Sequence, residues 1–142
     1  MSADQYAFSA SIPLSISEAE EALRRELAAE GFGVLTEIDV RATLRQKLDL
    51  EFRPYRILGA CNPALAHRAL MADPAVGVLL PCNVVLAEDH AGWTTVLFME
   101  PRAVMAGEGG ELETVANEAS ARLHRVADKL LAGRARVTSR SG

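Results

Sequence analysis

Two Cys-Asn dipeptides are the residues of this chain with the clearest capacity for chemistry. Cys61-Asn62 is followed by a proline, and Cys82-Asn83 is preceded by Pro81. A cysteine thiolate can act as a nucleophile or a metal ligand, and an asparagine side chain can bind a ligand or cap a helix. Asn-Pro is also typical of a helix start, because proline fits the first helical position. The candidate ligand-binding site consists of Cys61, Asn62, Pro81, Cys82 and Asn83.

The helix that follows Asn62 bears on the chemistry of both thiols. If the strands that carry the two dipeptides are neighbours, Cys61 and Cys82 converge beside this helix start. A helix N-terminus lowers the pKa of nearby thiols and attracts anions, so Cys61 would then gain thiolate character, and a small or anionic ligand would bind nearby. For the thiols themselves we favour the other interpretation, that both cysteines are small buried hydrophobic residues, which is the usual situation of free cysteine. No histidine or other base is tied to either thiol by local spacing.

Other constellations of reactive residues are weaker. Besides the cysteines, the candidate metal ligands are His67, His90 and His124, which are dispersed along the chain. A structural zinc site normally shows paired ligands at short spacing, so no metal site is predicted. The serines show no nucleophile-elbow pattern, and nothing brings two carboxylates together. The sequence therefore identifies no catalytic residue and no cofactor, and it leaves enzymatic activity open.

Composition limits the class of protein. The chain has 142 residues, of which 49% are hydrophobic and 24% charged, as expected for a single soluble domain. The net charge of −4 argues against nucleic-acid binding, which relies on a basic surface. No apolar run is long enough to span a membrane, and Met1 to Phe8 lack the pattern of a signal peptide. With only two cysteines, a reduced, cytoplasmic protein is expected.

Hydrophobic patterning predicts the order β-α-β-α-β-α-β-β-α. Strands are expected at Tyr6–Ser9, Phe32–Ile38, Tyr55–Gly59, Val78–Leu86 and Trp93–Met99, the last two as a hairpin. Helices are expected after Ser17, after Asp39, at Pro63–Ala72 and along Leu112–Leu130, where seven apolar residues repeat at helical spacing until Gly133. This pattern indicates an α+β fold with two layers, in which helices pack on a mainly antiparallel sheet. Residues 1–133 form the predicted domain, and 134–142, with three arginines and no acid, form a flexible basic tail.

Four segments of the chain resemble the domain of unknown function 302 family. They are Glu30-Gly31-Phe32, Glu37-Ile38-Asp39-Val40, Gly59-Ala60-Cys61-Asn62-Pro63 and Leu80-Pro81-Cys82-Asn83-Val84. The resemblance extends over nearly the whole chain, although the family pattern does not require the basic tail. It implies a compact α+β domain, a homodimer and a site near the two cysteines. It implies no activity.

Three hypotheses of function follow. The first is a non-catalytic, homodimeric module that binds a small or anionic ligand near Cys61, Asn62, Pro81, Cys82 and Asn83. The second is a thiol-dependent enzyme, redox protein or metal carrier that uses the two cysteines. The third is a purely structural dimerisation domain. A homodimer is expected independently of the resemblance, because a proline-broken strand and an apolar hairpin leave sheet edges to be covered. We favour the first hypothesis, without nucleic-acid or membrane partners.

Overall fold

The computed structural model describes residues 3–89, 91–105 and 109–141, with side-chain burial for 5–89, 91–105 and 109–133. The elements are α1 (Ala3–Tyr6), β1 (Ala7–Ile12), α2 (Ile16–Ala29), β2 (Gly33–Asp39), α3 (Val40–Leu48), β3 (Tyr55–Cys61), α4 (Pro63–Ala72), the 3-10 helix η1 (Pro74–Leu79), β4 (Cys82–Glu88), β5 (Thr94–Met99), α5 (Pro101–Met105) and α6 (Gly110–Ser141). The predicted α+β class and element order are confirmed. The short helices α1 and α5 and the turn η1 are additions to that order.

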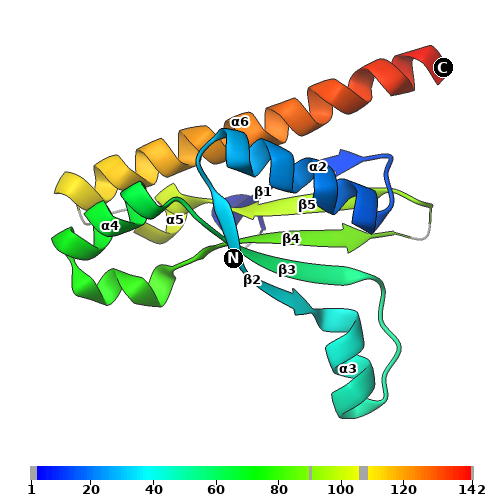
Figure 1. The fold of residues 1–142 in the computed structure, drawn as a ribbon, viewed down its shortest axis with the longest axis horizontal. Coiled ribbons are helices and arrows are strands. Elements are labelled where there is room, and N and C mark those ends of the chain that lie inside the picture. Colours follow the sequence, from blue (N-terminus) through cyan, green and yellow to red (C-terminus); the bar gives the residue numbers. More distant parts are fainter. Residues whose placement is uncertain (1–2, 90, 106–108, 142) are drawn as a thin grey trace.

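The five strands form one antiparallel sheet in the order β1-β5-β4-β3-β2. The two longest helices, α2 and α6, lie side by side over one face of this sheet (Figure 1). Alternate side chains of β4 and β5 point into the core between the layers, among them Val84, Leu86, Val96 and Phe98, which are fully buried. The intervening side chains of these strands point to the opposite face.

Helix α6 confirms the strongest sequence pattern but not its predicted end. All seven apolar positions from Leu112 to Leu130 are buried. Gly133 does not end the helix, which continues to Ser141. A glycine ends a helix when it adopts positive φ, and Gly133 does not. Side chains from residue 134 onward lie outside the described residues, so the flexible basic tail stays a prediction.

Helix α2 begins earlier than its predicted start. Ser15, not Ser17, is the N-cap: its Oγ accepts a hydrogen bond from the Glu18 amide at 3.2 Å. The Glu18 carboxylate in turn accepts from the Ser15 amide at 3.3 Å, which completes a capping box. Ser15 and Ser17 are each followed by a glutamate three residues later, so both fit the capping-box pattern. The observed start, at Ser15, places Ile16 in the core.

The segment 40–54, between β2 and β3, projects from the body of the molecule and is called the arm below (Figure 1). Asp39 caps its helix α3, as predicted, by accepting from the Ala42 amide at 2.9 Å. None of the residues of α3 is buried. The arm is therefore held mainly by its two strand connections rather than by a core of its own.

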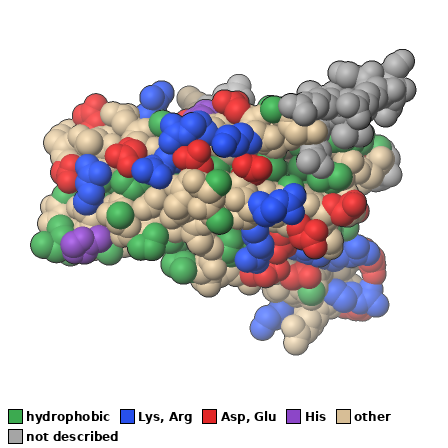
Figure 2. All heavy atoms as spheres, turned by 45° about the horizontal axis from the view of Figure 1, so that its top comes forward, with side chains coloured by type: hydrophobic (Ala, Val, Ile, Leu, Met, Phe, Trp, Pro, Cys, Tyr) green, Lys and Arg blue, Asp and Glu red, His purple; other side chains and the backbone are tan. Residues whose placement is uncertain are grey.

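Charged side chains of both signs are spread over the surface. Figure 2 shows basic and acidic side chains interspersed, without a broad basic region on the face that it draws. Many of them pair across elements, such as Arg125 with Glu30 at 2.9 Å. Within the described residues, no helix is long and apolar enough to cross a membrane.

Candidate functional site

The two Cys-Asn segments lie on neighbouring strands, as the sequence analysis required. β3 pairs with β4 so that Ala60 lies opposite Cys82 and Gly59 opposite Asn83. Cys61 and Cys82 line the same small cavity, which α4 and α6 close on the helix side. The structure therefore brings the thiols together.

Asn62 caps α4, as predicted. Its Oδ1 accepts a hydrogen bond from the Leu65 amide at 3.1 Å, and its Nδ2 donates to the Glu30 carbonyl at 3.4 Å. Arg122 of α6 donates to the same carbonyl at 2.8 Å. Asn62 thus joins the start of α4 to the turn after α2, and its polar atoms are occupied by the protein itself.

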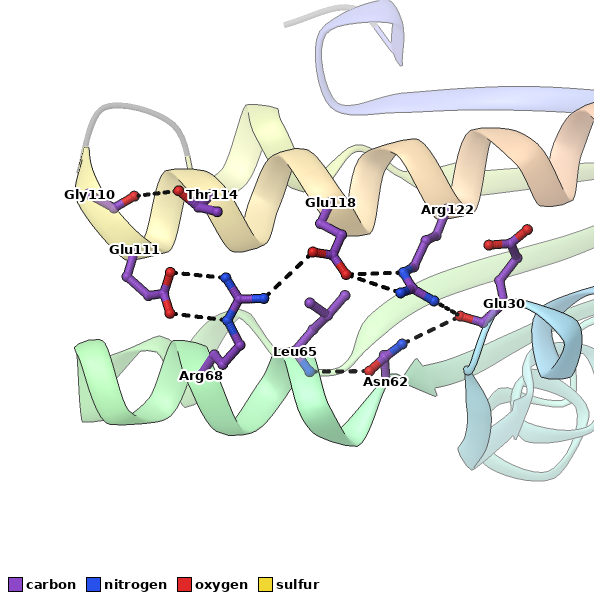
Figure 3. Close-up of polar contacts among 9 residues, drawn as sticks. All are labelled: Glu30, Asn62, Leu65, Arg68, Gly110, Glu111, Thr114, Glu118 and Arg122. Atoms are coloured by element: carbon purple, nitrogen blue, oxygen red, sulfur yellow. Dashed lines mark hydrogen bonds and ion pairs between the residues drawn. The ribbon is translucent and has the colours of Figure 1, made fainter.

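The contacts of Asn62 extend into a chain of ion pairs between α4 and α6 (Figure 3). Arg122 pairs with Glu118 at 3.1 Å, and Arg68 reaches Glu118 at 3.6 Å and Glu111 at 3.0 Å. The bidentate hydrogen bond from Arg68 lowers the pKa of Glu111 below its ordinary value. Because these charges are neutralised in pairs, the cluster holds the two helices together rather than presenting free charge to a ligand.

The cavity beside the cysteines is too small for an organic ligand. Its volume is about 30 Å³, and most of its lining is apolar, from residues such as Phe32, Leu65 and Met105. A volume of this size is sufficient for about one water molecule. It therefore resembles a packing space more than a binding site.

The surroundings of the two thiols do not favour the thiolate form. Burial raises the pKa of the Cys61 thiol, and it raises that of Cys82 to about 11, to which the nearby Cys61 also contributes. At the start of α4, the Leu65 amide already donates to Asn62 Oδ1 and not to a thiol. Desolvation disfavours the charged form of both thiols.

Both thiols are therefore expected to react slowly in the folded protein. With a disulfide reagent at pH 8, we expect Cys61, which is partly exposed, to react before Cys82, which is buried. The rate at Cys82 should increase roughly tenfold per pH unit up to about pH 11, because its pKa is about 11. The control is the protein unfolded in denaturant, where both thiols should react at the same ordinary rate. A thiol that reacts faster in the folded than in the unfolded protein would contradict this prediction.

Pro81 directly precedes β4, and this strand begins later than predicted. The residues before it form η1, and β4 starts at Cys82 rather than at Val78. The Leu80–Pro81 peptide bond is cis. A Cβ placed on Gly59 would lie 2.7 Å from Pro81 Cγ and closer still to Thr36 Oγ1, so glycine at position 59 allows these side chains to approach the β3 backbone.

Asn83 does not join the other four candidate residues. It alternates with Cys82 on β4 and points to the face of the sheet that α2 and α6 do not cover. There it lines a groove of about 370 Å³, called the open-face groove below. The groove is lined by residues from α1, β1, β3, β4, β5 and α5, namely Tyr6, Ala7, Tyr55, Asn83, Val85, Leu97, Phe98, Met99 and Val104.

The open-face groove combines apolar walls with a few polar groups. Val85, Leu97 and Met99 come from the centre of the sheet, and the phenol-bearing Tyr6 and Tyr55 come from its ends. No lining residue carries a formal charge. A cavity of this size and character suits a small uncharged molecule, which the polar groups would orient.

Neither His67 nor His124 lines the small cavity or the open-face groove. His124 stacks on Phe8 with ring centroids 3.7 Å apart and bonds to Glu100 at 2.8 Å. Burial opposes ionisation of Glu100, but hydrogen bonds from His124 and Ser120 outweigh it and lower the pKa of Glu100. His67 lies on α4, and His90 lies outside the described residues. Among the residues that the structure describes, no three side chains of His, Cys, Asp or Glu lie close enough together to hold a metal ion.

Sequence reasoning missed the groove, although one signal was present. The strands β4 and β5 contain Val84-Val85-Leu86 and Val96-Leu97-Phe98-Met99, in which apolar residues occupy both faces. A sheet with one face in water normally alternates apolar and polar residues. The apolar residues on the face away from α2 and α6 thus indicated a second apolar surface.

Comparison with known proteins places this architecture in a family. The family model described as "Domain of unknown function DUF302" matches residues 8–130. The chain belongs to the DUF302 family. The match includes both Cys-Asn segments and every strand except the first residue of β1.

A solved DUF302 structure shares the fold. It is the crystal structure of an uncharacterised conserved DUF302 protein from Bacillus stearothermophilus, with 29% sequence identity and a TM-score of 0.80. The similarity covers 87% of this chain and 97% of that protein. A search of curated proteins finds no match. These comparisons establish the family and the fold, and they assign no activity.

Proposed function

We propose that this DUF302 domain is a non-catalytic binding module that holds a small, uncharged and largely apolar molecule in the open-face groove. The observation that carries the proposal is the groove itself, whose volume of about 370 Å³ lies within the range of small-molecule sites. Asn83, from the second Cys-Asn segment, is the one predicted site residue that lines it. Its carboxamide can donate and accept hydrogen bonds at the same time.

Charge and burial argue for this ligand class over the alternatives. An anionic ligand would be left without a cation, because no lining residue of the groove is charged. Thiol chemistry has less support, because burial raises the pKa of both cysteines. Cys61, Asn62, Pro81 and Cys82 line the small cavity beside α4 and lie outside the groove, so we assign them a structural role. Two free cysteines favour a reducing, cytoplasmic location.

An uncharged fluorescent probe, N-phenyl-1-naphthylamine, tests the groove. We expect enhanced fluorescence with the folded chain and a dissociation constant on the order of micromolar, as for small apolar ligands of this size. Val85→Trp should weaken binding at least about tenfold, because the larger ring fills the centre of the groove.

The matched control is Val78→Trp, which places the same side chain on η1, where Val78 is 88% exposed and outside the groove. It should leave probe binding unchanged. Circular dichroism and thermal unfolding of both variants show whether the fold is kept. An equal loss of probe binding in both variants would contradict the proposal. So would a folded Val85→Trp protein that binds the probe as well as the wild-type chain does.

A further inference from the structure

The four strands that line the open-face groove keep their charged side chains on the other face of the sheet. Strands β1 and β5 contain no charged residue, and β3 and β4 contain one each. Arg56 of β3 donates to Glu20 of α2 at 2.8 Å. Glu88 of β4 accepts from the amide of Ile16, the first residue of α2, at 2.6 Å. Since α2 covers the core face, these strands offer a ligand in the groove only neutral polar groups.

Asn83 is an unusual residue for its place in the sheet. β4 is the central strand, and asparagine is depleted in strands because its side chain competes with the backbone for hydrogen bonds. The next residue of β4 on the same face is Val85, which pairs with Ile57 and Leu97 of the neighbouring strands. An apolar residue at position 83 would extend this apolar strip. Asn83 therefore calls for an explanation other than sheet stability.

The carboxamide of Asn83 has no partner within the described part of the chain, where no side chain or backbone group bonds to its Oδ1 or Nδ2. Gly59, which lies opposite Asn83 on β3, has no side chain to offer. Asn62 of the other Cys-Asn segment is the opposite case, since it accepts from the Leu65 amide and donates to the Glu30 carbonyl. Asn83 thus presents a donor and an acceptor side by side to the groove.

We propose that Asn83 determines the specificity of the groove, and that the ligand carries a neutral primary amide or lactam that pairs with its carboxamide. Nδ2 donates to the ligand carbonyl while Oδ1 accepts from the ligand N–H, as in other two-bond pairs made by asparagine. A ketone or ether only accepts, and a carboxylate also brings an uncompensated charge. The apolar body of the ligand lies over Val85 and Leu97. This inference rests on the proposed function, because it concerns the polar end of the same ligand.

Two matched ligands test the pairing. 1-Naphthamide and 1-acetylnaphthalene share a ring and a carbonyl group, but the amide carries NH2 where the ketone carries a methyl group. Their dissociation constants are measured by displacement of N-phenyl-1-naphthylamine from the full chain. The ratio of the two constants in the wild type is compared with the ratio in Asn83→Leu, so that the different hydration of the ligands cancels. We expect the relative preference for the amide to fall about fivefold in the variant, as for the loss of one hydrogen bond.

The matched control is Tyr55→Phe, which removes a polar group from the same groove and leaves Asn83 in place. It should leave the ratio unchanged. Because Asn83 is exposed, circular dichroism should show that Asn83→Leu keeps the fold. An unchanged ratio in the folded Asn83→Leu protein would overturn the inference. A ratio that falls as far in Tyr55→Phe would overturn it as well, because Asn83 would then not be the group that selects the ligand.

The same measurements separate this inference from the proposed function. If Val85→Trp weakens binding of the probe and of both naphthalenes while Asn83→Leu leaves their ratio unchanged, the groove binds ligands and the amide pairing is refuted. The pairing alone is also refuted if the probe binds in the groove and neither naphthalene displaces it. If the probe does not bind, or binds without sensitivity to Val85→Trp, the proposed function is refuted and the inference with it.

Discussion

Leu123→Ala is expected to lower the free energy of unfolding by about 2–5 kcal/mol. Leu123 lies at the middle of α6 with no exposed surface, where it packs with residues of α2 and the sheet. Removal of its side chain loses apolar burial and leaves a cavity that a sheet on one side and helices on the other cannot easily close. Urea denaturation followed by circular dichroism measures the change.

Leu131→Ala is the matched control on the same helix. Leu131 is 41% exposed, so the same truncation should cost less than about 0.5 kcal/mol, as usual for a surface site. Both variants replace leucine by alanine in α6, so they change helix propensity equally. The difference between their free energies of unfolding therefore reports the contribution of burial. Similar values for both would contradict the placement of α6 on the sheet.

Asn62→Ala is expected to destabilise the fold by about 1–3 kcal/mol, as for a lost helix cap that leaves a buried amide unpaired. The variant removes the acceptor of the Leu65 amide and one of the two donors to the Glu30 carbonyl. Gly31, at φ +85°, lies against the same side chain, since a Cβ there would be 2.9 Å from Asn62 Nδ2. Thermal unfolding of the variant measures the loss.

Asn62→Ser serves as the control, because a serine hydroxyl can cap α4 but cannot reach the Glu30 carbonyl in the same way. It should recover the part of the stability that comes from the cap. Probe binding in the groove should be unchanged in both folded variants, because Asn62 does not line it. If Asn62→Ala leaves stability unchanged and abolishes probe binding, Asn62 is a ligand residue and the assignment made above is wrong.

Local rules were sufficient to predict most elements of the fold. Asn62-Pro63 marked the start of α4, Asp39 marked the start of α3, and the spacing of Leu112 to Leu130 predicted the buried face of α6. Each of these signals depends on residues within a few turns of one another. Errors occurred where two local solutions were nearly equivalent, as with Ser15 and Ser17 before α2.

The site required information that no local pattern contains. Cys61 and Cys82 could be expected on adjacent strands, but their pKa values depend on burial by α4 and α6, which approach from elsewhere in the chain. Asn83 could be paired with Cys82 in sequence, yet strand alternation places it on the opposite face. The open-face groove joins Tyr6, Tyr55 and Val104 from three distant segments. Strand order and layer packing bring such residues together, because a fold's long-range contacts are set by the whole core rather than by spacing along the chain.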